Sequence, residues 1–167
     1  GGAVGYLTSG DLTGTQTRSG GIFNATVEVT FNNIYANYLG GVVGLISRAE
    51  VNSITVNGTI THLGISNVSY IGGVAGTNQS GIITESNINL TFDVVISNAV
   101  ISECYIGAVA GRLVIIGTTD CQVTNCVIDY PFIDCTVLSS NTIESIGIYG
   151  YRTADTNVIV SGCTQSS

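Results

Sequence analysis

The sequence contains no lysine, no methionine and no tryptophan, and it has only one proline and one histidine. Charged residues make up 9% of the chain, against about 25% in an ordinary soluble domain. Four arginines stand against 11 acidic residues, which gives a net charge of −7. Binding to a phosphate backbone requires clustered lysine and arginine side chains. We therefore expect no nucleic-acid partner.

Long apolar runs are also missing. No stretch reaches the roughly 18 uninterrupted apolar residues of a membrane-spanning helix, so we expect no insertion into a membrane. The sequence has no charged-then-apolar leader, and residue 1 falls inside a repeated motif. We interpret residues 1–167 as a single repeat domain that was cut from a longer chain. Its polar residues are mainly Ser, Thr and Asn, which is typical of extracellular and cell-surface proteins.

What the chain does contain is a repeated glycine motif. The motif reads YLGGVVG at 38–44, YIGGVAG at 70–76 and YIGAVAG at 105–111, with a truncated copy at 1–5 and a degenerate one at 146–150. The closing glycines of the five copies are separated by 39, 32, 35 and 39 residues. Such spacing indicates repeats that bury their apolar faces against their neighbours. The glycines that we expect to be structural are Gly44, Gly73, Gly76, Gly111 and Gly150.

The rest of the chain is typical of β-strands. Short runs such as 25–31 and 87–92 alternate β-branched and polar residues, and no segment has the apolar stripe of a helix. We predict an all-β fold, a β-solenoid of about five coils with 32–39-residue repeats. A β-propeller is the alternative, although a blade takes about 40–50 residues. The coils expected from the motif spacing cover about 1–39, 40–71, 72–106, 107–146 and 147–167.

Residues 72–83, GGVAGTNQSGII, are the best copy of the motif and its polar continuation. This segment resembles the GLUG-type glycine-rich repeat. The resemblance implies a secreted or surface β-solenoid-like module of the kind found in large adhesin-type proteins. It implies no catalytic residues, so none are transferred to this chain.

Catalytic chemistry has little support in the sequence. The acidic residues are scattered, no Asp-x-Asp pair occurs, and His62 has no obvious partners. We expect a protein without enzymatic activity, metal or cofactor. The alternative is a carbohydrate-binding or carbohydrate-cleaving β-helix, which would need Arg48 and Arg112 to line one groove with aromatic side chains. The aromatic candidates for that groove are Tyr35, Tyr38, Tyr70 and Tyr105.

The cysteines all lie in the last part of the chain. None has the Cys-x-x-Cys spacing of zinc or redox motifs. Aligning residues 123–126 with 160–163 places Cys126 and Cys163 at the same position of neighbouring coils. Stacked coils separate such Cα atoms by about 5 Å, within disulfide range. Burial as small apolar side chains is the other interpretation. The full set is Cys104, Cys121, Cys126, Cys135 and Cys163.

Asn-x-Ser/Thr sequons are candidate glycosylation sites. Two of them, Asn57 and Asn89, each lie thirteen residues after a closing glycine, so we expect them to stack in one row. That row would carry glycans, or it would form an asparagine ladder of side-chain hydrogen bonds. The candidates are Asn24, Asn57, Asn67, Asn78 and Asn89.

These observations predict a structural protein that assembles through its outermost coils. The outermost coils of a solenoid expose unpaired backbone groups, which form a template for another strand. We expect the chain to join copies of itself end to end, as a filament or surface layer, with glycans as a further candidate partner.

Overall fold

The computed structural model describes residues 2–8, 20–32, 34, 36–61, 68–96, 103–129, 133–137 and 142–165. Within these ranges the chain forms strands and no helix, as the sequence predicts. The strands are β1 (Val4–Thr8), β2 (Gly21–Phe23), β3 (Thr26–Asn32), β4 (Tyr38–Gly40), β5 (Val43–Ser47), β6 (Glu50–Asn52), β7 (Thr55–Thr61), β8 (Val68–Gly72), β9 (Ala75–Gln79), β10 (Ile82–Thr84), β11 (Asn87–Ile96), β12 (Glu103–Val114), β13 (Cys121–Thr124), β14 (Val127–Ile128), β15 (Ile133–Val137), β16 (Thr142–Arg152), β17 (Val158–Ser161) and β18 (Thr164–Gln165).

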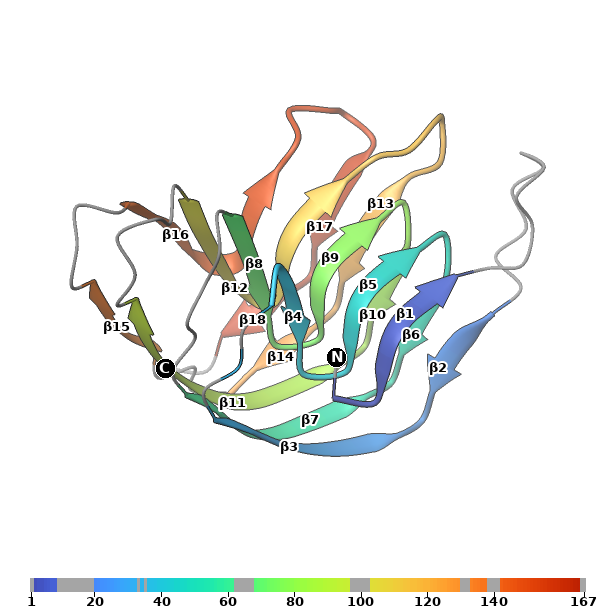
Figure 1. Cartoon of the computed structure of the whole chain (residues 1–167). Helices are drawn as coiled ribbons and strands as arrows, with labels where there is room; N and C mark the ends of the chain where they lie inside the picture. The colour runs from blue at the N-terminus through green and yellow to red at the C-terminus, as the bar shows by residue number, and fades with distance from the viewer. Residues whose placement is uncertain are drawn as a thin grey trace.

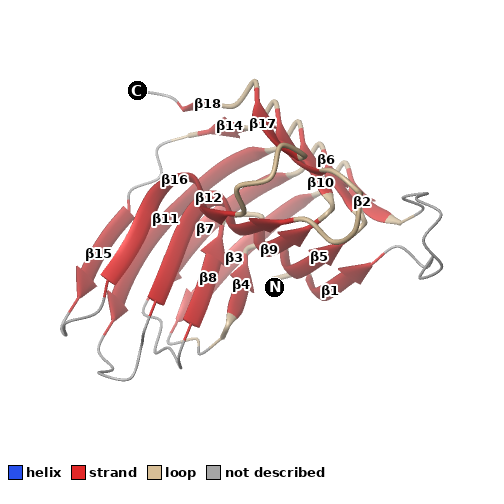
Figure 2. Ribbon diagram, turned by 90° about the horizontal axis from the view of Figure 1, so that it is seen from above, coloured by secondary structure: helices blue, strands red, loops and turns tan. Residues whose placement is uncertain are grey.

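These strands form three curled sheets that run side by side (Figures 1 and 2). The first has the order β1-β5-β9-β12-β8-β4, with β16 also on β12. The second has the order β17-β13-β10-β6-β2, and the third β18-β14-β11-β7-β3, with β15 on β11. Every described pairing is parallel. Propeller blades belong to the antiparallel architectures, so this fold is β-solenoid-like and the propeller alternative is wrong.

Parallel pairing places like residues in columns, by which we mean residues at equivalent register positions of neighbouring strands. In the second sheet, Val51 is paired with Ile22 on one side and Ile83 on the other, and Ile83 is paired with Val123. Because side chains alternate between the two faces of a strand, a column that points inward does so in every strand. The period-two runs of the sequence thus become continuous apolar stacks.

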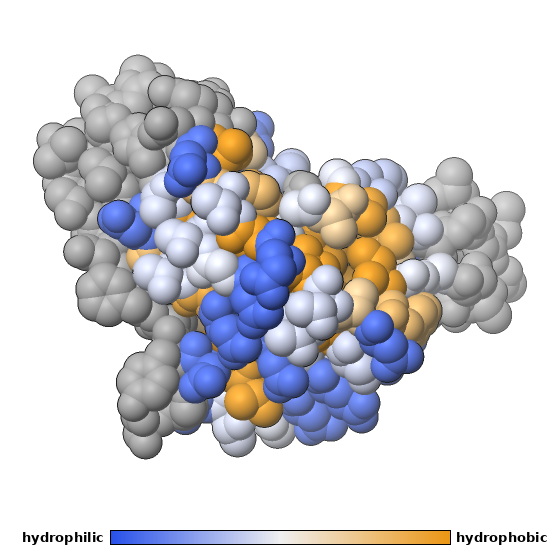
Figure 3. All heavy atoms as spheres, turned by 90° about the horizontal axis from the view of Figure 1, so that it is seen from below, coloured by the Kyte–Doolittle hydropathy of each residue, from blue (hydrophilic) through white to orange (hydrophobic). Residues whose placement is uncertain are grey.

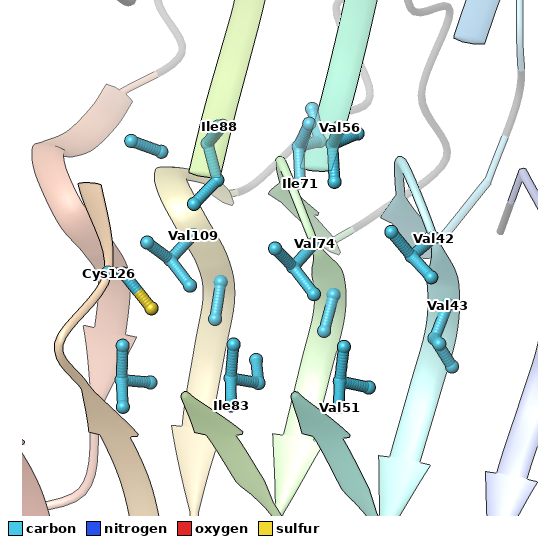
Figure 4. Close-up of a cluster of buried hydrophobic side chains, with 14 of the residues drawn as sticks. Val42, Val43, Val51, Val56, Ile71, Val74, Ile83, Ile88, Val109 and Cys126 are labelled. Atoms are coloured by element: carbon cyan, nitrogen blue, oxygen red, sulfur yellow. The ribbon is translucent and has the colours of Figure 1, made fainter. Parts of the chain in front are cut away.

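The core is made of such stacks of small β-branched side chains (Figure 4). Val42, Val74 and Val109 come from the three best copies of the glycine motif and are fully buried. Ile88 and Val56 approach them from the third sheet, and each is also fully buried. The motif therefore supplies both the bend in the first sheet and one stack of its core.

The first two glycines of the motif close a sharp bend between two strand segments, such as β8 and β9. A Cβ added to Gly72 would collide with the carbonyl oxygen of Ala75, on the other arm of the bend. At Gly73, a Cβ would lie 2.8 Å from Cγ2 of Ile88. Backbone packs directly on backbone here, and no side chain fits between the arms.

The closing glycines are required for the same reason. A Cβ on Gly76 would lie 2.5 Å from the Leu39 amide nitrogen and 2.7 Å from the Gly44 carbonyl oxygen. A Cβ on Gly111 would lie 2.7 Å from the Gly76 oxygen, and one on Gly150 would lie 2.7 Å from the Gly111 oxygen. None of these glycines has a positive φ. Close approach, and not an unusual backbone conformation, explains the motif.

In the degenerate copy at 146–150, the distance from the first glycine to the closing glycine is one residue shorter than in 105–111, and the structure shows where the difference falls. Gly107 is paired with Gly147, but Ala110 is already paired with Tyr149. The irregularity lies between these two pairs, so the closing glycines Gly111 and Gly150 still coincide.

The turn between the second and third sheets repeats a left-handed backbone conformation that the sequence did not reveal. One residue in each turn has a positive φ of 51° to 65°. Only one of the five is glycine, and left-handed conformations cost other L-residues about 1–2 kcal/mol. The members of this left-handed column are Asn24, Ser53, Glu85, Asn125 and Gly162.

Candidate functional site

The sheet edges are the first candidate site. Strands β1, β2, β3 and β4 each pair with a single described strand, namely β5, β6, β7 and β8. At the opposite edge, β16, β17 and β18 each pair only with β12, β13 and β14 among the described strands. Both edges therefore present backbone N–H and C=O groups that have no strand partner within the described part of the chain.

Large apolar side chains are exposed along the same edges. On the first edge these are Tyr6, Phe23 and Tyr38, and on the second Tyr151 and Ile159. Tyr6 and Phe23 are more than half exposed, at 57% and 51%. Exposed apolar side chains that gather at one place mark interaction surfaces, whereas single ones are ordinary.

The outer face of the third sheet carries the row that the sequons predict. Seen from below, hydrophilic side chains form a stripe between apolar patches (Figure 3). Asn89 is paired with Asn57, and Asn57 with Glu28. The Asn89 side-chain amide donates to the Asn57 side-chain oxygen over 2.8 Å, and the Asn57 amide donates to the Glu28 carboxylate over 2.5 Å. The predicted ladder is present, and its first member, Glu28, was not predicted from the sequence.

The other sequons lie in different surroundings. Asn24 is exposed in the left-handed turn that follows β2, and Asn67 lies outside the described residues. Asn89 is exposed and Asn57 is partly buried. Of the described candidates, Asn24 and Asn89 thus offer the most room for a glycan.

Asn78 is not a usable glycosylation site in this fold. Its side chain is fully buried. The side-chain oxygen accepts a hydrogen bond from the Gly81 amide at 2.9 Å, and the side-chain nitrogen donates to the carbonyl oxygens of Gly81 and Gln122. A glycan would have to replace these contacts within the core, so the prediction for Asn78 is corrected: this side chain holds the turn after β9.

The tyrosines that precede the motif form a stack. The rings of Tyr38 and Tyr70 are 5.9 Å apart and those of Tyr70 and Tyr105 are 5.3 Å apart, with interplanar angles of 8° and 9°. Tyr151 meets Tyr105 edge-on at 5.2 Å. The guanidinium of Arg112 lies 5.1 Å from the Tyr70 ring centre and 5.9 Å from that of Tyr151. The arrangement is a ladder of aromatic rings with one cation over it.

The tyrosine stack brings together only some of the residues of the carbohydrate-binding groove considered from the sequence, namely Tyr38, Tyr70, Tyr105 and Arg112. Arg48 lies in the turn between β5 and β6, where a Cβ on Gly117 would approach its guanidinium to 3.7 Å. Tyr35 and His62 lie outside the described residues. The side chain of Thr77, beside Arg112 in register, is fully buried, and its hydroxyl has no hydrogen-bond partner among the residues that the structure describes. No pattern in the sequence pointed to Thr77.

Cys126 and Cys163 occupy the same position in neighbouring turns, as predicted. Thr124 is paired with Ser161 two residues before them, and Val127 with Thr164 one residue after. Both cysteines are free thiols. Cys126 is fully buried and Cys163 partly so. The disulfide itself stays a prediction. The side chain of Cys135 lies outside the described ones.

In the described part of the chain, no three His, Cys, Asp or Glu side chains come together in a way that could hold a metal ion. The described residues also include no helix long and apolar enough to cross a membrane. No family model, no curated protein and no solved structure matches this chain. The candidate sites therefore rest on the geometry alone: two open sheet edges, the amide ladder, the tyrosine stack and the thiol pair.

Proposed function

We propose that this chain is a non-enzymatic structural subunit, a β-solenoid of about five coils with 32–39-residue repeats, which joins copies of itself end to end. The observation that carries the proposal is the way its core columns end. Val51, Ile83 and Val123 are fully buried, whereas Ile22 and Val160, the outermost members of the same column, are only partly buried. Another strand on either side would complete the burial.

A head-to-tail contact continues these columns from one copy to the next. Placing β17 of one copy against β2 of another brings Val160 beside Ile22. The same displacement brings Tyr149, at the end of the column of Ala110, beside Val4, at the start of the column of Val43. Apolar side chains meet at both positions. A contact between two different surfaces of the same molecule does not close on itself and grows as a fibre.

The first edge also lacks the usual protection against such pairing. Natural edge strands are blocked by lysine, proline or inward-pointing charges. Strands β1 to β4 contain neither lysine nor proline, and Glu28 is their only charged residue. The net charge of −7 opposes contact between the sides of two molecules, which leaves the ends as the favoured surfaces.

An extracellular or cell-surface location fits the same features. The exposed amide ladder and the sequon at Asn24 provide a polar surface on which glycans have room. A filament or surface layer built from this chain would display that face along its whole length.

The carbohydrate-binding alternative has weaker support. Sugars stack on the free face of an aromatic ring, but Tyr70 has Tyr38 on one face and Tyr105 on the other. Tyr105 is also buried. The stack uses both faces of Tyr70 in the ladder itself, so within the described stack an open ring face is left to sugars mainly at Tyr38, on the first edge.

Electron microscopy and sedimentation of the purified chain test the proposal. We expect filaments or concentration-dependent oligomers for the wild-type chain. The variant Phe23→Lys places a charge on the open edge strand β2 and should shift the population to monomers. Ile116→Lys is the matched control, because Ile116 is similarly exposed but lies in no strand. A compact wild-type monomer at high concentration, with both edges protected from hydrogen exchange, would overturn the proposal.

A further inference from the structure

Near the C-terminal edge, Cys126 and Cys163 lie in neighbouring turns, and their two thiols have different surroundings. Cys126 follows β13 and is enclosed between the sheets, with its Sγ donating to the Thr124 carbonyl oxygen at 3.5 Å. Cys163 follows β17 and is partly open; in its protonated form its Sγ can donate to the Ser161 carbonyl oxygen at 3.6 Å or to the Val123 carbonyl oxygen at 3.8 Å. The Thr164 amide donates to the Cys126 carbonyl oxygen at 2.9 Å, which holds the two turns in register.

The two thiols also interact with each other. When its single proton is turned toward Cys163 instead of Thr124, the Cys126 thiol donates a hydrogen bond that stabilises the thiolate of Cys163 and lowers the pKa of Cys163 to about 6. The same hydrogen bond, together with burial, raises the pKa of Cys126. At neutral pH the open member of the pair is therefore a thiolate and the enclosed member a thiol, which is the division found in reactive cysteine pairs.

The other described cysteines lack this arrangement. Cys121 is buried, is paired in register with Val158, and donates to the Asn78 carbonyl oxygen at 3.3 Å. Cys104 is buried and is paired with Ser69 on one side and Ile143 on the other. Neither has a cysteine beside it in its own register column.

We propose that Cys126 and Cys163 form an oxidation site that takes a small-molecule disulfide, with Cys163 as the attacking group and Cys126 as the resolving group. The Cys163 thiolate attacks one sulfur of the small disulfide and expels one thiolate, leaving a mixed disulfide on Cys163. Cys126 then loses its proton to solvent and attacks the Cys163 sulfur, and the second small thiolate leaves. The protein loses two electrons and two thiols become one disulfide, while the small disulfide is reduced to two thiols.

The product bond would join the turn after β13 to the turn after β17. The second of these turns joins β17 to β18, the last described strands on the C-terminal edge, which have a neighbour on one side only within the described residues. Oxidation would therefore add a covalent link between these outermost strands and the rest of the fold.

Oxidised glutathione is a suitable probe, applied to the reduced chain near pH 7 and followed by alkylation and mass spectrometry of a non-reduced digest. The wild-type chain should yield one peptide pair cross-linked through Cys126 and Cys163, with the melting temperature raised by roughly 5–15 °C. Cys126→Ser should accumulate the glutathione mixed disulfide on Cys163, because the resolving thiol is missing. Cys163→Ser should take up little glutathione. Circular dichroism of both variants shows that they are folded.

Several outcomes would overturn the proposal. In one, Cys126 and Cys163 both remain alkylatable after the wild-type chain has been exposed to oxidised glutathione. In another, the cross-link joins a different pair, for which Cys135→Ser is the informative variant. Equal glutathione uptake by the wild type and Cys163→Ser would show that Cys163 is not the attacking group. Alkylation of Cys163 with a midpoint near pH 9 would do the same.

Discussion

Asn89 donates a hydrogen bond from its side-chain amide to the side-chain oxygen of Asn57, 32 residues earlier in the chain, over 2.8 Å. Since Asn57 donates in turn to Glu28, the three side chains form a continuous ladder along the outer face of the third sheet. An amide can donate and accept at once, so asparagine can extend such a ladder in both directions.

The amide ladder predicts energetic coupling between its members. Asn57→Ala breaks both hydrogen bonds and should lower the free energy of unfolding by about 1–2 kcal/mol, whereas Asn89→Ala should cost about 1 kcal/mol or less. Because the two residues share a bond, the double variant should cost less than the sum of the two single ones. Urea denaturation of the four chains measures this difference. Strict additivity would show that Asn57 and Asn89 are not energetically coupled.

The closing glycine of the motif predicts a strong steric effect. Gly76→Val would force a side chain against the backbone of Leu39 and Gly44, and it should destabilise the chain by about 3 kcal/mol or more. Gly5→Val is the control, because a Cβ at Gly5, the equivalent position on the edge, meets nothing within 4 Å. Thermal denaturation compares them. An unchanged melting temperature for Gly76→Val would contradict the packing described for the motif.

The tyrosine stack predicts that position along the ladder determines the cost of removing a ring. Tyr70 stacks on both sides and also faces Arg112, whereas Tyr38 stacks on one side and is 39% exposed. We expect Tyr70→Ala to cost about 3 kcal/mol and Tyr38→Ala about 1 kcal/mol. Chemical denaturation at several salt concentrations measures both values. Equal costs for the two variants would indicate that the rings act independently.

The left-handed column predicts opposite effects of two substitutions at equivalent positions. Glu85 has a φ of 51°, so Glu85→Gly relieves strain and should stabilise the chain by about 0.5–1 kcal/mol. Gly162 has a φ of 65°, and Gly162→Ala should destabilise it by about 1 kcal/mol or more, since the new Cβ would also meet Asn125. Melting temperatures distinguish the two directions. A loss of stability in Glu85→Gly would show that the Ser53–Glu85 side-chain contact outweighs the strain.

The thiol pair predicts a pH dependence in the reduced chain. The pKa of Cys163 is lowered to about 6 in the folded state, so between about pH 6 and 9 the unfolded state binds more protons and stability rises with pH. Cys126 acts in the opposite sense, because its raised pKa lowers stability only above the range where the unfolded thiol ionises. Reduced Cys163→Ser should lack the rise. Parallel profiles for the variant and the wild type would show that Cys163 is not perturbed.

Much of the fold could be predicted because the residues of one column recur along the sequence at the spacing of the repeat. The spacing of the closing glycines indicated which strands become neighbours, and the row of Asn57 and Asn89 followed from the same count. The reason is physical: parallel in-register pairing keeps each residue at a fixed offset from its equivalent in the next strand, as Val43 is from Ala75. A local motif therefore predicts a long-range contact.

Other features could not be predicted because they depend on the direction in which a side chain points and on how deeply it is buried. Asn78 and Asn89 carry the same sequon, yet Asn78 points into the core and accepts a hydrogen bond from the Gly81 amide. The left-handed turns could not be predicted because two of them are occupied by Ser53 and Glu85, residue types that rarely adopt that conformation. Side-chain orientation at the end of a strand is fixed by the turn and its partners, and composition alone does not reveal it.

The parallel pairing of the three sheets also gives the molecule a mechanical direction. Its interstrand hydrogen bonds run from β3 to β7 to β11, along the axis on which the strands are stacked, while the strands themselves lie across it. Tension along the stacking axis loads one row of bonds at a time and peels the outermost strand away. Tension along a strand loads all the bonds of that strand together in shear. A fibre of such units would be weakest at its free end and would lengthen under load by shedding strands in order.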